Sequence, residues 1–359
     1  MPELVIEGLV KKFGPSFAID DVNISVKDGE FFTLLGPSGC GKSTTLASIA
    51  GLIDLDAGSI KVGDRVVFDK AKGINLPPER RSLGMVFQSY ALWPHMTVEG
   101  NVGLPLRIRK TSATVRRAKV AQALEMIGLS AMAGRYPHEL SGGQQQRTAL
   151  ARSLAYEPSL LLLDEPLSNL DAKLRDSAGV SLKKIQQQIG VTTVYVTHDQ
   201  TEALSLSDRI AVMGEGKVLQ IGTPTEIYAS PGNLSVASFV GRCNFLPGTV
   251  RSSSDGSIFV GLDGMNQNVR VELERPITVG QRVTLGIRPE HVVVRDHAAG
   301  STDGNTLAVR LGTQVYVGAR FEYHLELGER TIRAEGAAPI QSGEIEVVLP
   351  SSQIMVFET

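Results

Sequence analysis

The sequence is poor in cysteine and in aromatic residues: it has two cysteines, one tryptophan and 5% aromatic residues among 359. Cys40 and Cys243 lie far apart, and Cys40 stands inside a glycine-rich segment. No disulfide framework is therefore expected, and a reducing compartment is the simpler interpretation. The sequence also lacks any run of about 18 uncharged apolar residues, so we expect no membrane-spanning helix. Residues 1–14 lack the cationic segment and apolar core of a secretory signal.

No strong charge of either sign is present, because the formal net charge is −2. This balance gives no sign of nucleic acid as the main ligand. With 42% hydrophobic and 21% charged residues, the composition is typical of a soluble globular protein. The length predicts two or three domains, with a core large enough to need no disulfide or metal for stability.

Short apolar runs alternate with longer amphipathic stretches in roughly the first two thirds of the chain. Each run is closed by glycine, aspartate or histidine, which is typical of buried strands in a parallel sheet. The helical stretches between them predict right-handed β-α-β crossovers. The strands expected on this basis are residues 31–35, 160–163, 192–197 and 209–213.

A helical subdomain is predicted inside this sheet domain, at about residues 88–156. Residues 116–127 repeat apolar side chains at helical spacing, which places Val120, Leu124 and Ile127 on one face. Residues 144–155 form a second helical stretch, and no strand-like run stands between the two. We interpret the segment as an insertion into the sheet domain.

The pattern changes after about residue 236. Short β-rich runs at 283–287, 292–294 and 345–349 stand between clusters of Gly, Ser, Asp and Asn, which predicts a small all-β barrel or sandwich. Glycine and proline interrupt the helical signals near 232–241. The sequence therefore divides into an α/β domain at 1–235 and a β-rich domain at 236–359.

A phosphate-binding loop is predicted at residues 36–43, which match G-x-x-x-x-G-K-[ST] between a predicted strand and a helical stretch at 43–52. The glycines let the backbone wrap closely around phosphates, and the helix N-terminus adds positive potential. Lys42 is expected to reach the β- and γ-phosphates of ATP, and Ser43 to hold Mg²⁺. A chance glycine-rich turn is the alternative. The residues assigned to the nucleotide in this segment are Gly36, Pro37, Ser38, Gly39, Cys40, Gly41, Lys42, Ser43 and Thr44.

Two acids follow the apolar run at 160–163. In an open α/β sheet, ligands bind at the carboxyl ends of the strands, so we expect Asp164 to face Mg²⁺ and Glu165 to polarise the attacking water. An acidic turn after a strand is the structural alternative. His198 follows the strand at 192–197 and could orient the water, although a lone histidine is more often structural.

A second anion-type loop is predicted about a hundred residues after the first, just before the helical stretch at 144–155. Serine can cap that helix, and adjacent glycines leave backbone N–H groups exposed. Since the first loop already covers one side of a nucleotide, the second is better placed to contact a nucleotide held by another copy. This predicts a head-to-tail homodimer that encloses two ATP molecules, with an ordinary turn as the alternative. The residues are Leu140, Ser141, Gly142, Gly143 and Gln144.

This combination of motifs closely resembles the ABC ATPase family over about residues 3–235. The resemblance implies a P-loop NTPase (RecA-like) sheet domain with an inserted helical subdomain. It also implies that Phe13 stacks on adenine, that Gln88 ligates Mg²⁺ or its water, and that His198 and Glu165 are catalytic beside Lys42. Residues 168–171 correspond to the D-loop of the family.

The C-terminal third is similar to the OB-like, TOBE-type regulatory extension of one importer branch, in which residues 288–290 (Arg-Pro-Glu) have a counterpart. The resemblance implies the ATP-hydrolysing subunit of an importer, peripheral on the cytoplasmic side of the inner membrane. Membrane permease subunits are expected to contact about residues 88–106, and a substrate-binding protein to act indirectly. A loop with one packed aromatic is the alternative for residues 93–95. The expected solute is a polyamine, ferric iron, a phosphonate or a similar polar or charged solute, with a sugar as the alternative.

Two rival classes are weighed against this interpretation. An ABC protein acting on nucleic acid or the ribosome would favour a long coiled-coil insertion or two cassettes in one chain, and a small-molecule P-loop kinase would lack residues 140–144. Asn169 stands where many family members carry alanine, and we expect this departure to be tolerated.

Overall fold

The computed structural model describes residues 3–254, 256–273, 277–296, 305–341 and 344–358. The chain divides into two compact units, Met1–Ala229 and Ser230–Thr359, and each is described by itself. The division falls between Ala229 and Ser230, whereas the sequence places the domain boundary between residues 235 and 236.

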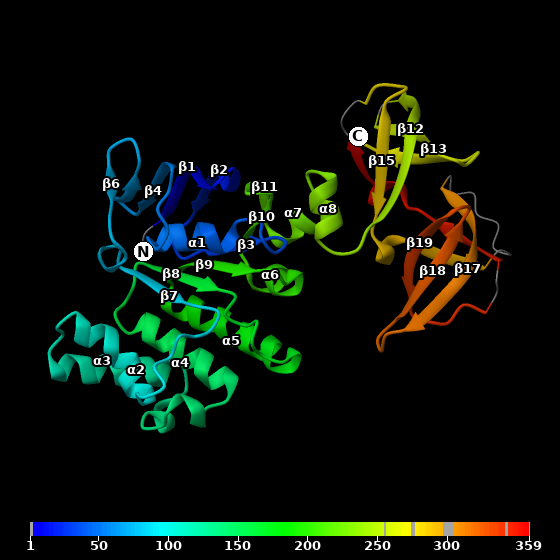
Figure 1. The fold of residues 1–359 in the computed structure, drawn as a ribbon. Helices are drawn as coiled ribbons and strands as arrows, with labels where there is room; N and C mark the ends of the chain where they lie inside the picture. Colours follow the sequence, from blue (N-terminus) through cyan, green and yellow to red (C-terminus); the bar gives the residue numbers. More distant parts are fainter. Residues whose placement is uncertain (1–2, 255, 274–276, 297–304, 342–343, 359) are drawn as a thin grey trace. The chain divides into compact units, whose positions relative to one another are not determined.

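The first unit is built on a six-stranded sheet whose order is β11-β10-β3-β9-β8-β7 (Figure 1). All neighbouring strands are parallel except β10 and β11. Strands β3 and β9 are buried along their whole length, as expected where helices or strands cover both faces of a parallel sheet. The four strands expected from apolar runs all lie in this sheet. The bounds are β3 Phe31–Leu35, β7 Leu83–Val86, β8 Leu160–Asp164, β9 Thr192–Thr197, β10 Arg209–Gly214 and β11 Lys217–Gly222.

A second sheet, antiparallel and of order β2-β1-β4-β5-β6, was not predicted. In β1 and β2, buried apolar side chains are interrupted by more exposed and mostly polar or charged ones, so these strands lack the continuous apolar runs that indicated the first sheet. Helix α1 (Lys42–Ala50) lies between the two sheets (Figure 1). The strand bounds are β1 Leu4–Phe13, β2 Ser16–Val26, β4 Ala57–Val62, β5 Arg65–Asp69 and β6 Ile74–Asn75.

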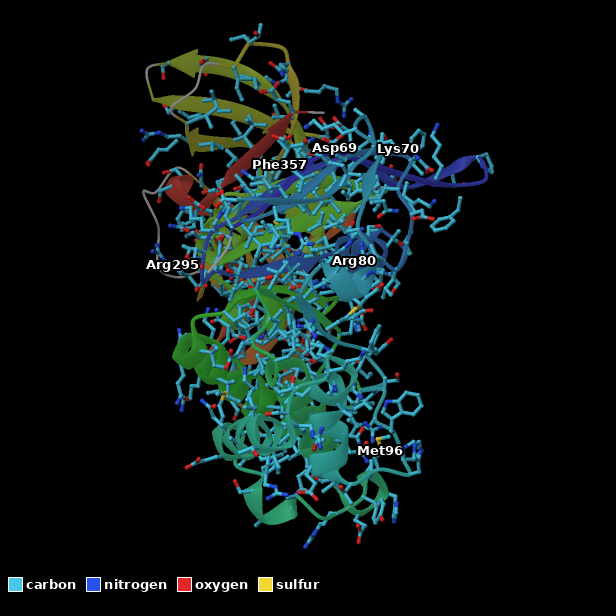
Figure 2. All side chains as sticks on the ribbon, turned by 90° about the vertical axis from the view of Figure 1, so that its left-hand side faces the viewer. Asp69, Lys70, Arg80, Met96, Arg295 and Phe357 are labelled. Atoms are coloured by element: carbon cyan, nitrogen blue, oxygen red, sulfur yellow. The ribbon has the colours of Figure 1, made fainter. Side chains whose placement is uncertain are left out.

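Three helices form the predicted helical segment, with no strand among them: α2 (Val98–Ile108), α3 (Ala113–Met126) and α4 (Gly142–Leu154). Val120, Leu124 and Ile127 are buried together in the apolar core of these helices. Figure 2 shows Met96, which precedes α2, at the opposite end of this unit from Asp69, the last residue of β5, and from Lys70, which follows it. The unit also contains α5 Ala172–Ile189, α6 Gln200–Leu206, α7 Pro224–Ala229 and the short 3-10 turns Pro78–Arg80, Ser130–Met132 and Pro137–Glu139.

The second unit is β-rich and has its own apolar core. Its two five-stranded antiparallel sheets have the orders β14-β13-β12-β15-β21 and β16-β20-β17-β18-β19. The Arg288 guanidinium is buried and donates to the carbonyls of Ala237, Val240 and Arg242. The Arg-Pro-Glu segment thus ties helix α8 to this unit. The bounds are α8 Leu234–Phe239, β12 Asn244–Ser254, β13 Ser257–Leu262, β14 Asn268–Glu272, β15 Arg282–Ile287, β16 Val293–Asp296, β17 Thr306–Tyr316, β18 Phe321–Leu327, β19 Arg330–Gly336, β20 Glu344–Val348 and β21 Met355–Glu358, with turns Pro289–His291 and Ser351–Gln353.

Candidate functional site

The glycine-rich loop connects β3 to α1 at the carboxyl edge of the parallel sheet. Gly41, which caps α1, has a φ of +101°, and a Cβ there would lie 2.2 Å from the Ala18 carbonyl oxygen. A Cβ on Gly36 would lie 2.4 Å from the Met213 carbonyl oxygen. Real Cβ atoms do not approach backbone so closely, so the fold itself requires glycine at both positions. Neighbouring backbone thus holds the loop from two sides.

Lys42 is buried, at 5% exposure, and its charged end is held inside the loop. Its Nζ donates to the carbonyls of Gly36 and Pro37, both at 2.8 Å. An ammonium group is costly to bury without partners, and here carbonyl dipoles of its own loop supply them. The amine is therefore kept where the loop N–H groups and α1 would meet a phosphate.

Ser43 and Asp164 meet at the end of β8. The Ser43 Oγ donates to Asp164 Oδ1 at 2.9 Å. Burial raises the pKa of Asp164, and the hydrogen bond from Ser43 opposes that shift; the charge of Glu165 raises this pKa further, and Lys42 lowers it. A hydroxyl and a partly buried carboxylate at one point form the kind of oxygen set that Mg²⁺ accepts beside a triphosphate. The pair fits the cation expected from the sequence.

Glu165 is held by two side chains that arrive from neighbouring strand ends. Gln88, after β7, donates from Nε2 to Glu165 Oε2 at 3.2 Å, and His198, after β9, places Nδ1 3.1 Å from Oε1. Glu165 itself has a φ of +43°, which is uncommon for a residue with a side chain and recurs at functional sites. The structure therefore brings together Gln88, Glu165 and His198.

The loop after Gln88 contains a feature that the sequence did not reveal. Tyr90 and Ala91 both have positive φ, at +61° and +48°. The Arg152 guanidinium, on α4, donates to both of their carbonyls, at 2.8 and 2.6 Å. Asn169 donates from Nδ2 to the Gln88 carbonyl at 2.6 Å. Tyr90 and Ala91 are not glycine, so nothing in the sequence signals that both adopt the left-handed backbone conformation. The hydrogen bonds from Arg152 and Asn169 that hold this loop therefore become visible only in the fold.

A cavity of about 50 Å³ adjoins Glu165 and His198. Such a volume holds one water molecule. Its other walls are polar, so a water there would have the partners it needs. They are Ser168, Arg175, Thr197, Asp199 and Glu202.

The second glycine-rich loop begins α4 and is built differently. The Ser141 backbone N–H donates to the Gln144 side chain at 2.9 Å, which closes the first turn. A Cβ on Gly143 would meet nothing within 4 Å. Figure 1 shows α4 on the opposite side of the parallel sheet from α1. Among the described residues no hydrogen bond or ion pair joins residues 140–144 to residues 36–43, so one chain does not bring the two loops together.

Phe13 is exposed at the end of β1, with 55% of its surface accessible. The Lys11 Nζ lies 5.2 Å from the centre of its ring. The returning strand β2 carries Ala18, whose carbonyl packs against Gly41. The hairpin that presents Phe13 is therefore anchored to the glycine-rich loop.

Comparisons with known proteins show which family the chain is similar to. Residues 19–168 match the ABC transporter model, and residues 285–357 match the TOBE domain. The chain is 44% identical to the trehalose/maltose import ATP-binding protein MalK of Thermococcus litoralis, over 97% of this chain and 95% of that protein. The chain belongs to the ABC transporter family of ATP-binding subunits.

Other relatives of this ABC subunit serve different import systems. It is also 44% identical to the spermidine/putrescine import ATP-binding protein PotA of Chromobacterium violaceum, over 92% of this chain and 89% of that protein. A bacterial ABC transporter cassette solved as a dimer matches with a TM-score of 0.53 and 34% identity, covering 62% of this chain and 98% of that one. As a member of this family, the ABC subunit binds ATP and is an ATPase coupled to transport. Among the described residues, no helix of the ABC subunit combines the length and hydropathy needed to cross a membrane.

Proposed function

We propose that this chain hydrolyses ATP as a head-to-tail homodimer that drives solute import through separate permease subunits. One observation carries the proposal: Glu165 is held by Gln88 and His198 beside the Ser43–Asp164 pair, while the loop at 140–144 lies away from its own phosphate loop. The contacts of Glu165 support a hydrolytic site. The position of the loop at 140–144 supports a pocket that a second copy of the chain completes.

ATP with Mg²⁺, when bound, supplies the γ-phosphorus that water attacks, and ADP leaves with the bridging oxygen. In this chain, Lys42 and the N–H groups of its loop would bind phosphate oxygens, and Ser43 and Asp164 would hold the cation. Glu165 accepts the proton of the attacking water at a carboxylate oxygen. Gln88 and His198 keep the two oxygens of that carboxylate oriented.

The dimer is supported by the exposed start of α4. Gly143 leaves its backbone open on one side, so a phosphate held by a second copy can approach the helix N-terminus. In that arrangement Ser141, Gly142, Gly143 and Gln144 of one copy complete the pocket around the nucleotide of the other. The matching dimeric cassette is consistent with this assembly.

A groove of about 510 Å³ on the helical lobe supports the permease contact. Most of its lining residues belong to α2 and α3. Several of them lie in the segment 88–106, where the sequence predicts contact with the permease. Arg107, Arg116 and Arg117 line it together with Glu99 and Glu125. We propose that a cytoplasmic segment of the permease docks here, so the subunit works peripherally at the cytoplasmic side of the inner membrane and a substrate-binding protein acts at a distance.

The relatives of this chain are named for several different solutes. Relatives at the same 44% identity are named for trehalose/maltose import and for spermidine/putrescine import. Others are named for Fe(3+) and for sulfate/thiosulfate. We propose a small polar or charged solute, with a sugar as the alternative, and expect the partner subunits to select it.

The test uses Glu165→Gln in the full chain. Glutamine keeps the size of the side chain but removes the base, so kcat should fall at least about a hundredfold while ATP affinity is retained. With ATP, sedimentation should show an accumulating dimer. Glu215→Gln is the matched control, since Glu215 also has a positive φ but lies exposed in the β10–β11 turn. Normal turnover by Glu165→Gln would show that Glu165 is not the base that accepts the proton from water. Turnover by a strictly monomeric chain would contradict the proposed dimer.

A further inference from the structure

The backbone around Gln88 is held by side chains rather than by strand or helix hydrogen bonds. Gln88 lies beyond the end of β7, where the sheet no longer fixes it. Arg152 binds the carbonyls of Tyr90 and Ala91, farther along the loop. Among the described residues, the side chain that holds the backbone of Gln88 itself is that of Asn169, whose amide donates to the Gln88 carbonyl at 2.6 Å. This amide is therefore an anchor for the residue that contacts Glu165.

Asn169 and its neighbour Ser168 bind two residues that also bind each other. Ser168 Oγ donates to the Glu165 carbonyl at 2.9 Å, and Asn169 donates to the Gln88 carbonyl. The Gln88 side chain then donates to the Glu165 carboxylate. These contacts form a closed ring in which residues 168–169 set the separation between Gln88 and Glu165.

We propose that Asn169 is a positioning residue, which acts through Gln88 to orient Glu165 for hydrolysis. The inference rests on the proposed function, because it assigns Asn169 a part in the same reaction. Alanine at this position lacks the donor, so it would leave the Gln88 carbonyl unheld while Arg152 still held Tyr90 and Ala91. The sequence led us to expect that asparagine in place of alanine is tolerated here; the proposal goes further and gives Asn169 a part in hydrolysis.

The experiment measures steady-state ATP hydrolysis by the full chain carrying Asn169→Ala, alone and combined with Gln88→Ala. Loss of one hydrogen bond should lower kcat about fivefold and leave the KM for ATP within about twofold, since no contact to nucleotide is removed. In the Gln88→Ala background the same substitution should change kcat less than about twofold. Asn169→Asp should lower kcat at least as much as alanine, because a carboxylate cannot donate to a carbonyl.

A second measurement does not depend on activity. Amide hydrogen exchange in the segment 87–92 should speed up in Asn169→Ala, since the loop loses an anchor. Asn266→Ala, at an exposed turn of the second unit, is the matched control and should change neither exchange in this segment nor kcat.

Two results would overturn the inference: unchanged kcat with unchanged exchange in Asn169→Ala, or an equal fall in kcat with and without the Gln88 side chain. Failure of the proposed function is separate. It would show as a wild-type chain that does not hydrolyse ATP, or as full turnover by Glu165→Gln, whatever Asn169→Ala does.

Discussion

Two glycine-rich loops begin helices in the same unit, and their glycines are needed for different reasons. In the loop at 36–43, Gly36 and Gly41 are crowded by backbone, at 2.4 and 2.2 Å from where a Cβ would stand. In the loop at 140–144, a Cβ on Gly143 would meet nothing within 4 Å, and this residue lies in the first turn of α4.

Glycine at 36 and 41 in the first loop is required by the fold of the chain itself, whereas glycine at 143 in the second loop is not. The first loop could not keep its backbone with a larger residue at Gly36 or Gly41, whatever it binds. The second could accept a methyl group at Gly143 without a clash inside its own chain, and glycine normally weakens a helix. We infer that what needs glycine at 143 approaches from outside the chain, as the nucleotide of a partner copy would.

The largest expected effect is on the first loop. Gly41→Ala combines a backbone clash with an unfavourable φ, so the free energy of unfolding should fall by about 3 kcal/mol. Urea or guanidinium unfolding of the full chain measures it. Gly143→Ala is the control that carries the same chemical change. Equal stability of wild type and Gly41→Ala would mean that the loop relaxes freely, and the contrast between the loops would disappear.

In the second loop we expect a smaller change in the free energy of unfolding, and of opposite sign. Gly143→Ala should stabilise the chain by about 0.5–1 kcal/mol, because alanine is the better helix former, while kcat for ATP falls about tenfold as the methyl group obstructs a partner's phosphate. Unfolding curves and steady-state hydrolysis on one preparation give both values. Full activity together with higher stability would show that this glycine serves no partner.

The smallest effect on stability concerns Asp164, the carboxylate that contacts the first loop through Ser43. Burial raises the pKa of Asp164 above its usual 3.8, so the folded state binds a proton more tightly than the unfolded state. The ionised Asp164 carboxylate therefore lowers the free energy of unfolding. This loss is complete at pH values above the pKa of the folded state, and it disappears as the pH falls from there toward the pKa of the unfolded state. Asp164→Asn should therefore raise Tm at pH 7, although turnover should be lost because the residue expected to hold the cation is changed.

The stability gain of Asp164→Asn should shrink toward pH 4, as measured by thermal unfolding over a pH series. Asp69 supplies the opposite sign, because a hydrogen bond from Lys72 lowers its pKa. Asp69→Asn should lose stability at pH 7 where Asp164→Asn gains it. A change of the same sign in both variants would mean that burial does not govern Asp164.

Much of the parallel sheet could be predicted because its strands are buried on both faces and therefore appear as uninterrupted apolar runs. Residues 31–35 and 192–197 coincide with β3 and β9. The antiparallel sheet escaped prediction because β1 and β2 carry lysine and aspartate among their apolar residues. β1 and β2 pair with each other across residues 14–15, but β1 also pairs with β4, which lies distant in sequence and which local patterns do not specify.

The sequence by itself determined the candidate residues for a phosphate and its cation, since the loop at 36–43 and the acids after β8 depend on residue type and spacing close along the chain. Only the tertiary structure decided how Gln88, Glu165, Asn169 and His198 come together, because they follow three different strands or lie in the loop beyond one. Their side chains meet only once those strands pair side by side. The physical reason is that hydrogen bonds act over about 3 Å, whereas the partners are separated by tens of residues along the chain.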